Sequence, residues 1–277
     1  RVLSTQLRVS RGSVVASYEQ LEAEGYLVAA AGSGTQVNPD LRGLHRRSTT
    51  TAAAPRAQHY QGIDLTPGAP DTAGLANSAW RSAWHRACVN PPRITDPLGS
   101  PGLREEIAEH LRQMRSLLAD PRQVVVTGGA RAGLAELIQV LCNGSHRLTI
   151  GVESPGYPSL RRVPTALGHR IAGLPTDNQG LDPASLPTGH GGKRLDAVLV
   201  TPSHQYPWGG SLSASRRAAV IEWAEKVSCW IVEDDFDSEL RHVGAPLPAL
   251  ASLDKKHTIL LGTFSSLLTP ALGCGYL

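Results

Sequence analysis

The sequence predicts an α/β protein in which helices cover a mainly parallel sheet, preceded by a smaller unit of helices and a hairpin. From about residue 63 onward, short and almost continuously apolar segments alternate with helical patterns, as expected for strands buried on both faces. The first 37 residues instead combine helix-type apolar spacing with a glycine-rich turn. At 277 residues, of which 41% are hydrophobic, the chain is long enough for one large domain and a smaller one.

The smaller unit divides into two helical patterns and a hairpin. A short turn at Arg8 separates the helices, Ser10 is a suitable N-cap for the second helix, and Gly25 is a suitable stop. The apolar residues of the second helix recur every three or four positions, which predicts one apolar face. These residues are Val14, Val15, Tyr18 and Leu21. Two short strands joined by a glycine-rich turn complete the pattern of a winged helix-turn-helix.

Three motifs of this unit occur together and in register: "VSRGSV", "LEAEGY" and "GSGTQV". They resemble the DNA-binding domain of GntR-type bacterial regulators. The resemblance implies that the second helix enters a major groove and that the wing lies beside the adjacent backbone. The implied DNA-binding residues are Ser10, Arg11, Ser13, Val14, Gly32, Ser33 and Gly34. In the alternative interpretation Arg11 is only a surface charge and the helix pair only packs against the rest of the protein.

Two departures from this family matter. Arg8 stands where the family usually turns on a small residue, and the helix that precedes these motifs in the family is absent from the sequence. We therefore expect residues 1–37 to be a partial DNA-binding domain.

The net charge of +3 is concentrated near the N-terminus. Residues 1–60 carry seven arginines and four acidic residues, a balance of +3, whereas residues 61–277 carry twenty basic and twenty acidic side chains. Most of the excess lies in the segment "LRGLHRRS" (41–48). Such a segment either lies beside nucleic-acid phosphates or is a solvated linker, and the sequence leaves both interpretations open.

Composition excludes several classes of protein. No apolar run approaches the roughly 20 residues that cross a bilayer, and the N-terminus lacks the apolar core of a secretory signal, so we expect a cytoplasmic protein without membrane contact. Neither a metal-ligand spacing nor a Ser-His-Asp arrangement stands out. The four cysteines form no C-x-x-C pair, which predicts small core residues rather than a zinc site or disulfides. They are Cys88, Cys142, Cys229 and Cys274.

The larger domain is expected over residues 62–277, after a linker at 38–61 that is rich in Thr, Ala, Arg and Pro. Five of its segments are typical of buried strands. They are 123–129, 146–152, 195–202, 228–235 and 257–265. Helical patterns at 130–142 and 213–227 lie between them. In sheets of this kind, ligands bind where strand ends meet helix starts.

The loops at these strand ends carry a second resemblance. "VESPGYP", "TPSHQYPWG", "IVEDDFDSELR" and "GTFSSLLTPALGCGYL" are similar, in this order, to signature segments of fold-type I aminotransferases. The similarity covers nearly all of residues 63–277. "TPSHQYP" and "EDDFDSE" in particular are similar to the MocR-type subgroup of GntR regulators, in which such a domain follows a winged helix. The resemblance implies a pyridoxal phosphate (PLP) transferase-like fold. We expect the chain to be truncated at both ends, without the C-terminal subdomain that usually supplies an arginine for the substrate carboxylate.

Part of a PLP site is kept. By the resemblance, the backbone at the start of helix 130–142 binds the phosphate and Asp234 holds the proton of the pyridine nitrogen. Tyr157 stacks on the ring and Tyr206 reaches its phenolic oxygen, although both are also compatible with ordinary core aromatics. Arg131 either contacts the phosphate or is an exposed helix charge. The implied cofactor-binding residues are Gly129, Ala130, Arg131, Tyr157, Tyr206, Asp234 and Ser265.

Other parts of the site are lost. The family's Schiff-base lysine is Ser266 here, and a hydroxyl group cannot form an imine. Three further family positions are degenerate: the phosphate-binding arginine is Gly273, a tyrosine is Phe236, and the tyrosine that reaches a partner subunit's phosphate is Ile94. None of the chain's lysines is a convincing substitute. They are Lys193, Lys226, Lys255 and Lys256. We therefore predict no catalytic residues, and PLP bound non-covalently if it is bound at all.

The order of the two motifs predicts a DNA-binding transcriptional regulator whose aminotransferase-like domain dimerises and senses a small-molecule effector related to PLP or an amino acid. The expected partners are a double-stranded DNA operator and a second copy of the chain. Two alternatives remain. One is an active PLP-dependent aminotransferase, against which Ser266 argues. The other is a pseudoenzyme that binds PLP or a preformed cofactor–amino acid adduct without a covalent bond.

Overall fold

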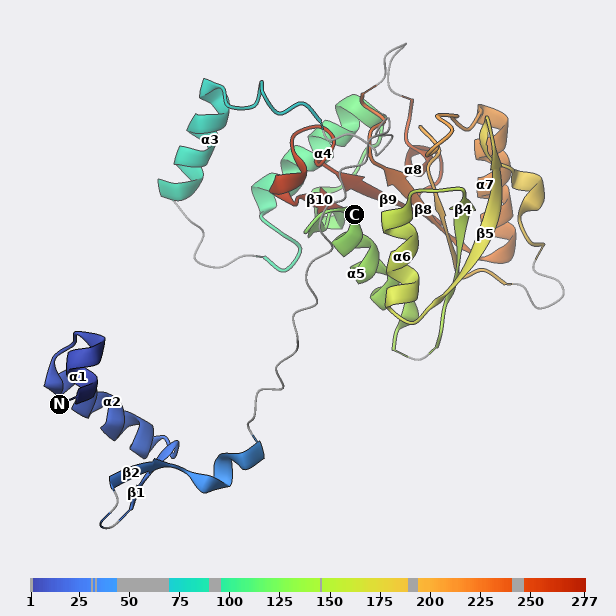
Figure 1. Ribbon diagram of the computed structural model, residues 1–277. Coiled ribbons are helices and arrows are strands. Elements are labelled where there is room, and N and C mark those ends of the chain that lie inside the picture. Colours follow the sequence, from blue (N-terminus) through green and yellow to red (C-terminus); the bar gives the residue numbers. More distant parts are fainter. Residues whose placement is uncertain are drawn as a thin grey trace, which may run out of the picture. The chain divides into compact units, whose positions relative to one another are not determined.

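The computed structural model describes residues 2–30, 32, 34–43, 70–89, 96–144, 146–188, 194–240 and 247–277. The chain divides into two compact units, Arg1–Thr66 and Pro67–Leu277 (Figure 1). Ser33, Ile94 and Lys193, which the sequence analysis singled out, lie outside the described residues, as does most of the predicted linker.

The first unit contains two helices followed by a hairpin. They are α1 (Val2–Leu7), α2 (Arg11–Ala23) and the antiparallel strands β1 (Leu27–Ala30) and β2 (Gly34–Val37), after which a 3-10 turn spans Pro39–Gly43. Ser10 forms the predicted N-cap of α2, because its Oγ accepts a hydrogen bond from the backbone N–H of Ser13 at 3.0 Å. Arg8 turns the chain with a φ of +53°, a conformation that glycine adopts at lower cost.

The predicted apolar face of α2 is not buried. Val15, Tyr18 and Leu21 keep 46%, 41% and 38% of their surface exposed, and α2 has no buried residue. A pair of short helices beside a two-stranded hairpin has too little chain to enclose a core. The spacing of apolar residues therefore predicted the helix but not its packing.

Within the described part of the second unit, an eight-stranded sheet forms the centre (Figure 1). Its strands are β3 (Val126–Thr127), β4 (Thr149–Ser154), β5 (Arg170–Asp177), β6 (Gly180–Leu181), β7 (Ala197–Val200), β8 (Trp230–Asp235), β9 (Thr258–Thr263) and β10 (Gly275–Tyr276). Their order across the sheet is β3-β10-β9-β8-β7-β4-β5-β6. The pairs from β5 through β4, β7 and β8 to β9 are parallel, whereas β6 and β10 run antiparallel to their neighbours. The predicted mainly parallel sheet is confirmed.

Helices cover both faces of this sheet. They are α4 (Pro101–Arg115), α5 (Ala130–Cys142), α6 (Pro158–Ala166), α7 (Ala214–Val227) and α8 (Leu250–Leu253). A further helix, α3 (Ser78–Val89), has no buried residue. On one face α7 buries Val220 in a cluster with Val198 and Ile231. The next residues along these strands, Leu199 and Val232, point to the other face, where α5 and α6 pack. Alternate residues of each central strand are thus buried on opposite sides, which explains the continuous apolar runs in the sequence.

Some elements differ from prediction. The strand expected at 123–129 shortens to Val126–Thr127, because its first residue closes a 3-10 turn and its two final glycines lead into α5. β5, β6 and β10 were not predicted. Of the four cysteines only Cys229 is buried, and Cys88 is exposed, so the expectation of four core residues is wrong for Cys88. Among the described residues no helix is long and apolar enough to cross a membrane.

Candidate functional site

The carboxyl ends of four parallel strands meet at one edge of the sheet. The register pairs Val200 of β7 with Glu233 of β8, and Asp234 with Leu261 of β9. The residues that follow β4 and β7 therefore lie beside Asp234. This is the edge at which open α/β sheets bind ligands.

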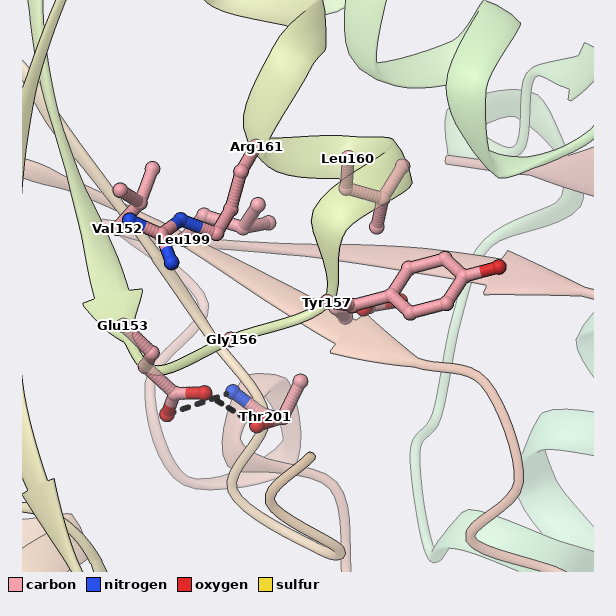
Figure 2. Close-up of a pocket in the computed structure, with 9 residues that line it drawn as sticks. Val152, Glu153, Gly156, Tyr157, Leu160, Arg161, Leu199 and Thr201 are labelled. Atoms are coloured by element: carbon pink, nitrogen blue, oxygen red, sulfur yellow. Dashed lines mark hydrogen bonds between the residues drawn. The ribbon is translucent and has the colours of Figure 1, made fainter. Parts of the chain in front are cut away.

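A shallow hollow that is open to solvent lies at this edge (Figure 2). Its lining residues are Val152, Glu153, Gly156, Tyr157, Leu160, Arg161, Leu199, Thr201 and Asp234. Tyr157 and Asp234 were predicted from the sequence. Glu153 and Thr201 lie in segments that resemble the family but were given no ligand role, and Arg161 lies outside those segments. The lining combines apolar side chains, one aromatic ring, two carboxyl groups and one guanidinium, which is the mixture expected of a small-molecule site.

Asp234 is the most perturbed carboxyl group of the hollow. Its side chain is buried, and Oδ1 has no hydrogen-bond partner. Burial, followed by the charges of Asp235, Glu153, Asp237 and Glu233, raises the pKa of Asp234 well above its ordinary value of 3.8. A protonated nitrogen of a ligand would supply both the missing donor and a compensating charge.

A hydrogen-bond network ties the loop after β4 to the loop after β7. The carboxyl group of Glu153 accepts from the backbone N–H of Thr201 at 3.2 Å and from its Oγ1 at 2.5 Å. Gln205 is fully buried, and its Nε2 donates to the carbonyl of Pro155 at 2.9 Å and to that of Tyr206 at 2.5 Å. Burial raises the pKa of Glu153, which favours its protonated form. The network fixes the two loops that carry the tyrosines of the site.

The two predicted tyrosines are in contact. The rings of Tyr157 and Tyr206 meet edge to face, with centroids 5.5 Å apart. Tyr157 is 42% exposed, so part of its ring remains free for a ligand. Tyr206 does not line the hollow itself.

A buried ion pair supports the strand that carries Asp234. The guanidinium of Arg115, at the end of α4, lies 2.8 Å from Asp235 and 3.7 Å from Glu233, and it donates to Ser203 Oγ at 2.9 Å. Glu233 also accepts from the backbone N–H groups of Leu250 and Ala251, yet burial raises its pKa to about 7. Asp234 is therefore held between two carboxyl groups that each have a partner, although Oδ1 of Asp235, like Oδ1 of Asp234, has none.

Phe236, which the sequence predicts to be a degenerate family position, stacks on His204. The ring centroids are 5.8 Å apart with an interplanar angle of 16°. His204 in turn binds Asp237 through Nδ1 at 2.5 Å. The ring of Phe236 thus has a packing role, and it offers no hydroxyl group to a ligand.

The predicted phosphate-binding residues lie toward the other side of Asp234. Gly129 is the N-cap of α5 with a φ of +94°, and a Cβ placed on Gly275 of β10 would lie 2.9 Å from the Cα of Gly129. The first N–H groups of a helix have no intrahelical partner, so those of Ala130 and Arg131 are available to an anion. The Arg131 side chain is exposed. None of these three residues lines the hollow.

The serine pair follows β9. Ser265 Oγ accepts from Thr263 Oγ1 at 2.9 Å, and Ser266 is half-buried. Gly273 has a φ of +56°, a left-handed conformation that favours glycine over the family's arginine. Lys255 precedes β9 and donates to the carbonyl of Leu118 at 3.2 Å, at the end of the strand opposite Ser266. Lys255 therefore does not lie where the resemblance expects a lysine, at Ser266.

Comparison with known sequences places the chain among regulators with an aminotransferase domain. The profile of the family described as "Aminotransferase class I and II" matches residues 61–273. The whole chain is 54% identical to the HTH-type pyridoxine biosynthesis transcriptional regulator PdxR of Corynebacterium glutamicum, of which it covers 59%. It is 32% identical to the probable rhizopine catabolism regulatory protein MocR of Rhizobium meliloti, again covering 59% of that protein. The predicted resemblance to MocR-type regulators is confirmed, and the chain spans less than two thirds of these relatives.

Solved structures agree on the fold of the second unit. An archaeal alanine:glyoxylate aminotransferase matches with a TM-score of 0.67 and 26% identity, covering 76% of this chain and 54% of that one. A kynurenine aminotransferase of Pyrococcus horikoshii matches with a TM-score of 0.68 and 24% identity over the same shares. The predicted fold-type I aminotransferase-like architecture is confirmed.

Proposed function

Because the chain belongs to the aminotransferase class I and II family, we propose that its second unit binds PLP or a PLP compound non-covalently and acts as a sensor rather than a catalyst. We further propose that the whole protein is a DNA-binding transcriptional regulator; one relative is named an HTH-type transcriptional regulator and another a probable regulatory protein. The name of the relative that is 54% identical suggests that the regulated genes serve pyridoxine biosynthesis.

The buried carboxyl group of Asp234 is the observation that carries the sensing proposal. An oxygen without a hydrogen-bond donor, surrounded by other carboxyl groups, favours a ligand that brings a protonated nitrogen. The pyridine nitrogen of PLP has this chemistry, and Asp234 would keep its proton in place. The free part of the Tyr157 ring would pack against the pyridine ring, and the start of α5 would receive the phosphate. When bound, PLP supplies an electron-poor ring; the chain's own residues bind and orient it.

Ser266 and Gly273 determine how the ligand is held. Neither a serine hydroxyl nor a glycine provides the amine or the guanidinium of the family pattern. The ligand therefore depends on hydrogen bonds, stacking and charge, and it exchanges with free ligand in solution. Exchange of this kind suits a sensor, because occupancy then follows the ligand concentration.

The first unit is the proposed DNA-binding part. Arg11 follows the N-cap of α2 and is exposed, and Gly32 and Gly34, both with positive φ, shape the turn between β1 and β2. These are the positions that a winged helix-turn-helix directs toward bases and phosphates. Regulators of this class read paired half-sites as dimers, so we propose a homodimer on a double-stranded operator.

Calorimetric titration of the purified chain with PLP tests the sensing proposal. We expect saturable binding, with a ligand that native mass spectrometry detects and denaturation removes. A covalent adduct after borohydride reduction would contradict non-covalent binding, and no heat of binding at millimolar PLP would contradict sensing.

Footprinting of the full-length protein on its own upstream region tests the DNA proposal. Arg11→Ala should weaken protection at least tenfold, whereas Arg162→Ala, an exposed arginine of the second unit, should leave it unchanged. Absence of sequence-specific protection by the parent protein would refute the proposal.

A further inference from the structure

The amino ends of the five parallel strands form the edge of the sheet opposite the hollow. The backbone N–H of Arg170 donates to the carbonyl of Leu148 at 2.9 Å, and the N–H of Ile231 donates to that of His257 at 2.7 Å. Further bonds of this kind join the segment before β7 to its neighbours. We call these five segments the amino edge, and they follow the order of β5, β4, β7, β8 and β9 across the sheet. They are residues 169–170, 146–148, 194–196, 228–230 and 254–257.

The amino edge is basic. It carries five exposed arginine and lysine side chains and two aspartates, a balance of +3 with its histidines neutral. Both aspartates have partners within the fold: Asp196 accepts from the backbone N–H of Thr149 at 2.7 Å, and Asp254 accepts from that of Lys256 at 2.9 Å. Among the described residues none of the five cations forms an ion pair. They are Arg147, Arg170, Arg194, Lys255 and Lys256.

The acidic residues of the same strands lie at their carboxyl ends. β8 ends in Glu233, Asp234 and Asp235, and residues 61–277 as a whole carry no net charge, so the excess at the amino edge is offset elsewhere. β8 has six residues. At about 3.3 Å per residue its two ends lie roughly 16 Å apart, which is about twice the Debye length of roughly 8 Å at physiological ionic strength. The carboxyl ends therefore do not cancel the positive field at the amino edge.

The length of the amino edge suits a polymer of phosphates. Five strands at about 4.8 Å spacing make a row of roughly 19 Å, and one strand of duplex DNA presents a phosphate about every 3.4 Å along its axis. A small anion would meet only one or two of these cations. Near the centre of the row Trp230 is 39% exposed, beside the ring of His257 with centroids 6.5 Å apart, and it offers an apolar surface to a sugar.

We propose that the amino edge of the second unit binds the phosphates of double-stranded DNA that flanks the operator. This inference rests on the proposed DNA binding by the first unit, which keeps DNA at a high local concentration. It gives the aminotransferase-like unit a share of the affinity that does not depend on base sequence, because contacts to phosphates position a protein without reading bases.

A role in stability is the alternative. α5, α6 and α7 end at Cys142, Ala166 and Val227, shortly before three of the segments of the amino edge. Basic side chains near the carboxyl end of a helix stabilise it through the helix dipole. That role predicts that removing the cations lowers the stability of the fold and leaves DNA affinity unchanged.

Two duplexes of different length test the inference. One contains only the segment of the upstream region that the full-length protein protects, and the other extends it by about two helical turns, roughly 20 base pairs, on each side. We expect the parent protein to bind the longer duplex about tenfold more tightly at about 0.05 M salt, with a smaller gain at about 0.2 M salt. The triple variant Arg147→Gln, Arg170→Gln, Lys256→Gln should lose this gain. Its affinity for the short duplex should change less than about twofold, and its slope of log affinity against log salt concentration on the longer duplex should fall by roughly 3.

A matched control removes the same charge elsewhere in the second unit. Arg81→Gln, Arg86→Gln, Arg162→Gln changes three exposed arginines of α3 and α6 and should keep both the gain and the salt slope. Urea unfolding of each variant measures stability separately. Lys256→Gln alone keeps the inference testable should the triple variant fail to fold, and it should lower the slope by roughly 1.

The outcomes distinguish the two proposals. If the parent protein protects no specific segment, the proposed DNA binding fails and the inference fails with it. If the parent binds both duplexes equally, or the triple variant keeps the gain, the inference is overturned while the proposed function stands. A triple variant that is less stable but keeps the gain would assign these cations to the helix ends. An equal loss in the control would assign the gain to net charge and would also overturn the inference.

Discussion

Asp234→Asn should make the ligand-free protein more stable and the ligand-bound protein less stable. The buried Oδ1 of Asp234 lacks a donor, and neighbouring carboxyl groups disfavour its charge. An unsatisfied buried polar group costs about 1–3 kcal/mol, and more when it is charged. Asparagine keeps the shape without the charge, so we expect a gain of about 1 kcal/mol in the free energy of unfolding at pH 8.

The gain in the free energy of unfolding from Asp234→Asn should depend on pH. The pKa of Asp234 is raised in the folded state, above the ordinary value of 3.8, chiefly by burial. The folded protein therefore keeps a proton that the unfolded chain has released, and the stability of the parent falls as the pH rises from about 3.8 through the folded-state pKa. The advantage of Asp234→Asn should consequently be larger at pH 8 than at pH 5.

Bound PLP should make the parent protein more stable than the Asp234→Asn variant. At a PLP concentration 100 times its dissociation constant, the parent protein gains about 2.7 kcal/mol, whereas a variant that binds 100-fold more weakly gains about 0.4 kcal/mol. With its initial advantage of about 1 kcal/mol, the variant would then be less stable than the parent by about 1.3 kcal/mol. Urea unfolding at both pH values, with and without PLP, measures these differences. Glu222→Gln, an exposed charge removal on α7, is the control. A ligand-free variant less stable than the parent at pH 8, or an equal gain from PLP, would refute the reasoning.

Three further predictions follow from the contacts around the site. Arg115→Met leaves the buried Asp235 without its partner and should cost about 3–5 kcal/mol in urea unfolding, whereas Arg112→Met, in an exposed pair with Glu109, should leave the unfolding midpoint almost unchanged. The hydrogen bond to Glu239 raises the pKa of His110, so this contact stabilises the fold below the ordinary value of 6.5 and its contribution is lost as the pH rises through the folded value. His110→Gln should therefore lower the melting temperature more at pH 6 than at pH 9, and an equal loss at both would contradict this assignment. Ser266→Lys should give a covalent PLP adduct after borohydride reduction that the parent lacks, and mass spectrometry that finds no adduct would place the ligand elsewhere.

The predictable strands are those buried on both faces. Segments 195–202, 228–235 and 257–265 contain β7, β8 and β9, because helices on both sides of the sheet require apolar residues at every position. β5 was missed because it is not buried on both faces. Five of its eight residues are exposed, and it contains a glycine and a proline, so it has no continuous apolar run. β10 is only two residues long and pairs through its backbone.

Within the candidate site, the sequence predicts residues that lie in local motifs but not residues that meet through long-range contacts. Asp234 and Tyr157 lie in segments whose resemblance to a family is visible in the sequence, and both line the hollow. Glu153 and Thr201 form their hydrogen bonds across 48 positions of chain, and no spacing rule connects residues so far apart. Arg161 is one of two adjacent arginines on α6, and only packing distinguishes the half-buried one from its exposed neighbour. Sequence alone therefore cannot single out Arg161 as a residue that lines the hollow.

The two ends of the proposed PLP site have diverged to different extents. On β8, Asp234 remains buried despite its unfavourable charge, and an ion pair of Arg115 with the next residue supports the strand. After β9, the resemblance places Ser266 and Gly273 at the positions of the family's lysine and arginine. A protein that had lost all use for a ligand would gain stability by replacing the buried carboxyl group, because an unsatisfied carboxyl group is costly to keep. Retention of Asp234 together with loss of the amine is the combination expected when binding is still required and covalent chemistry is not.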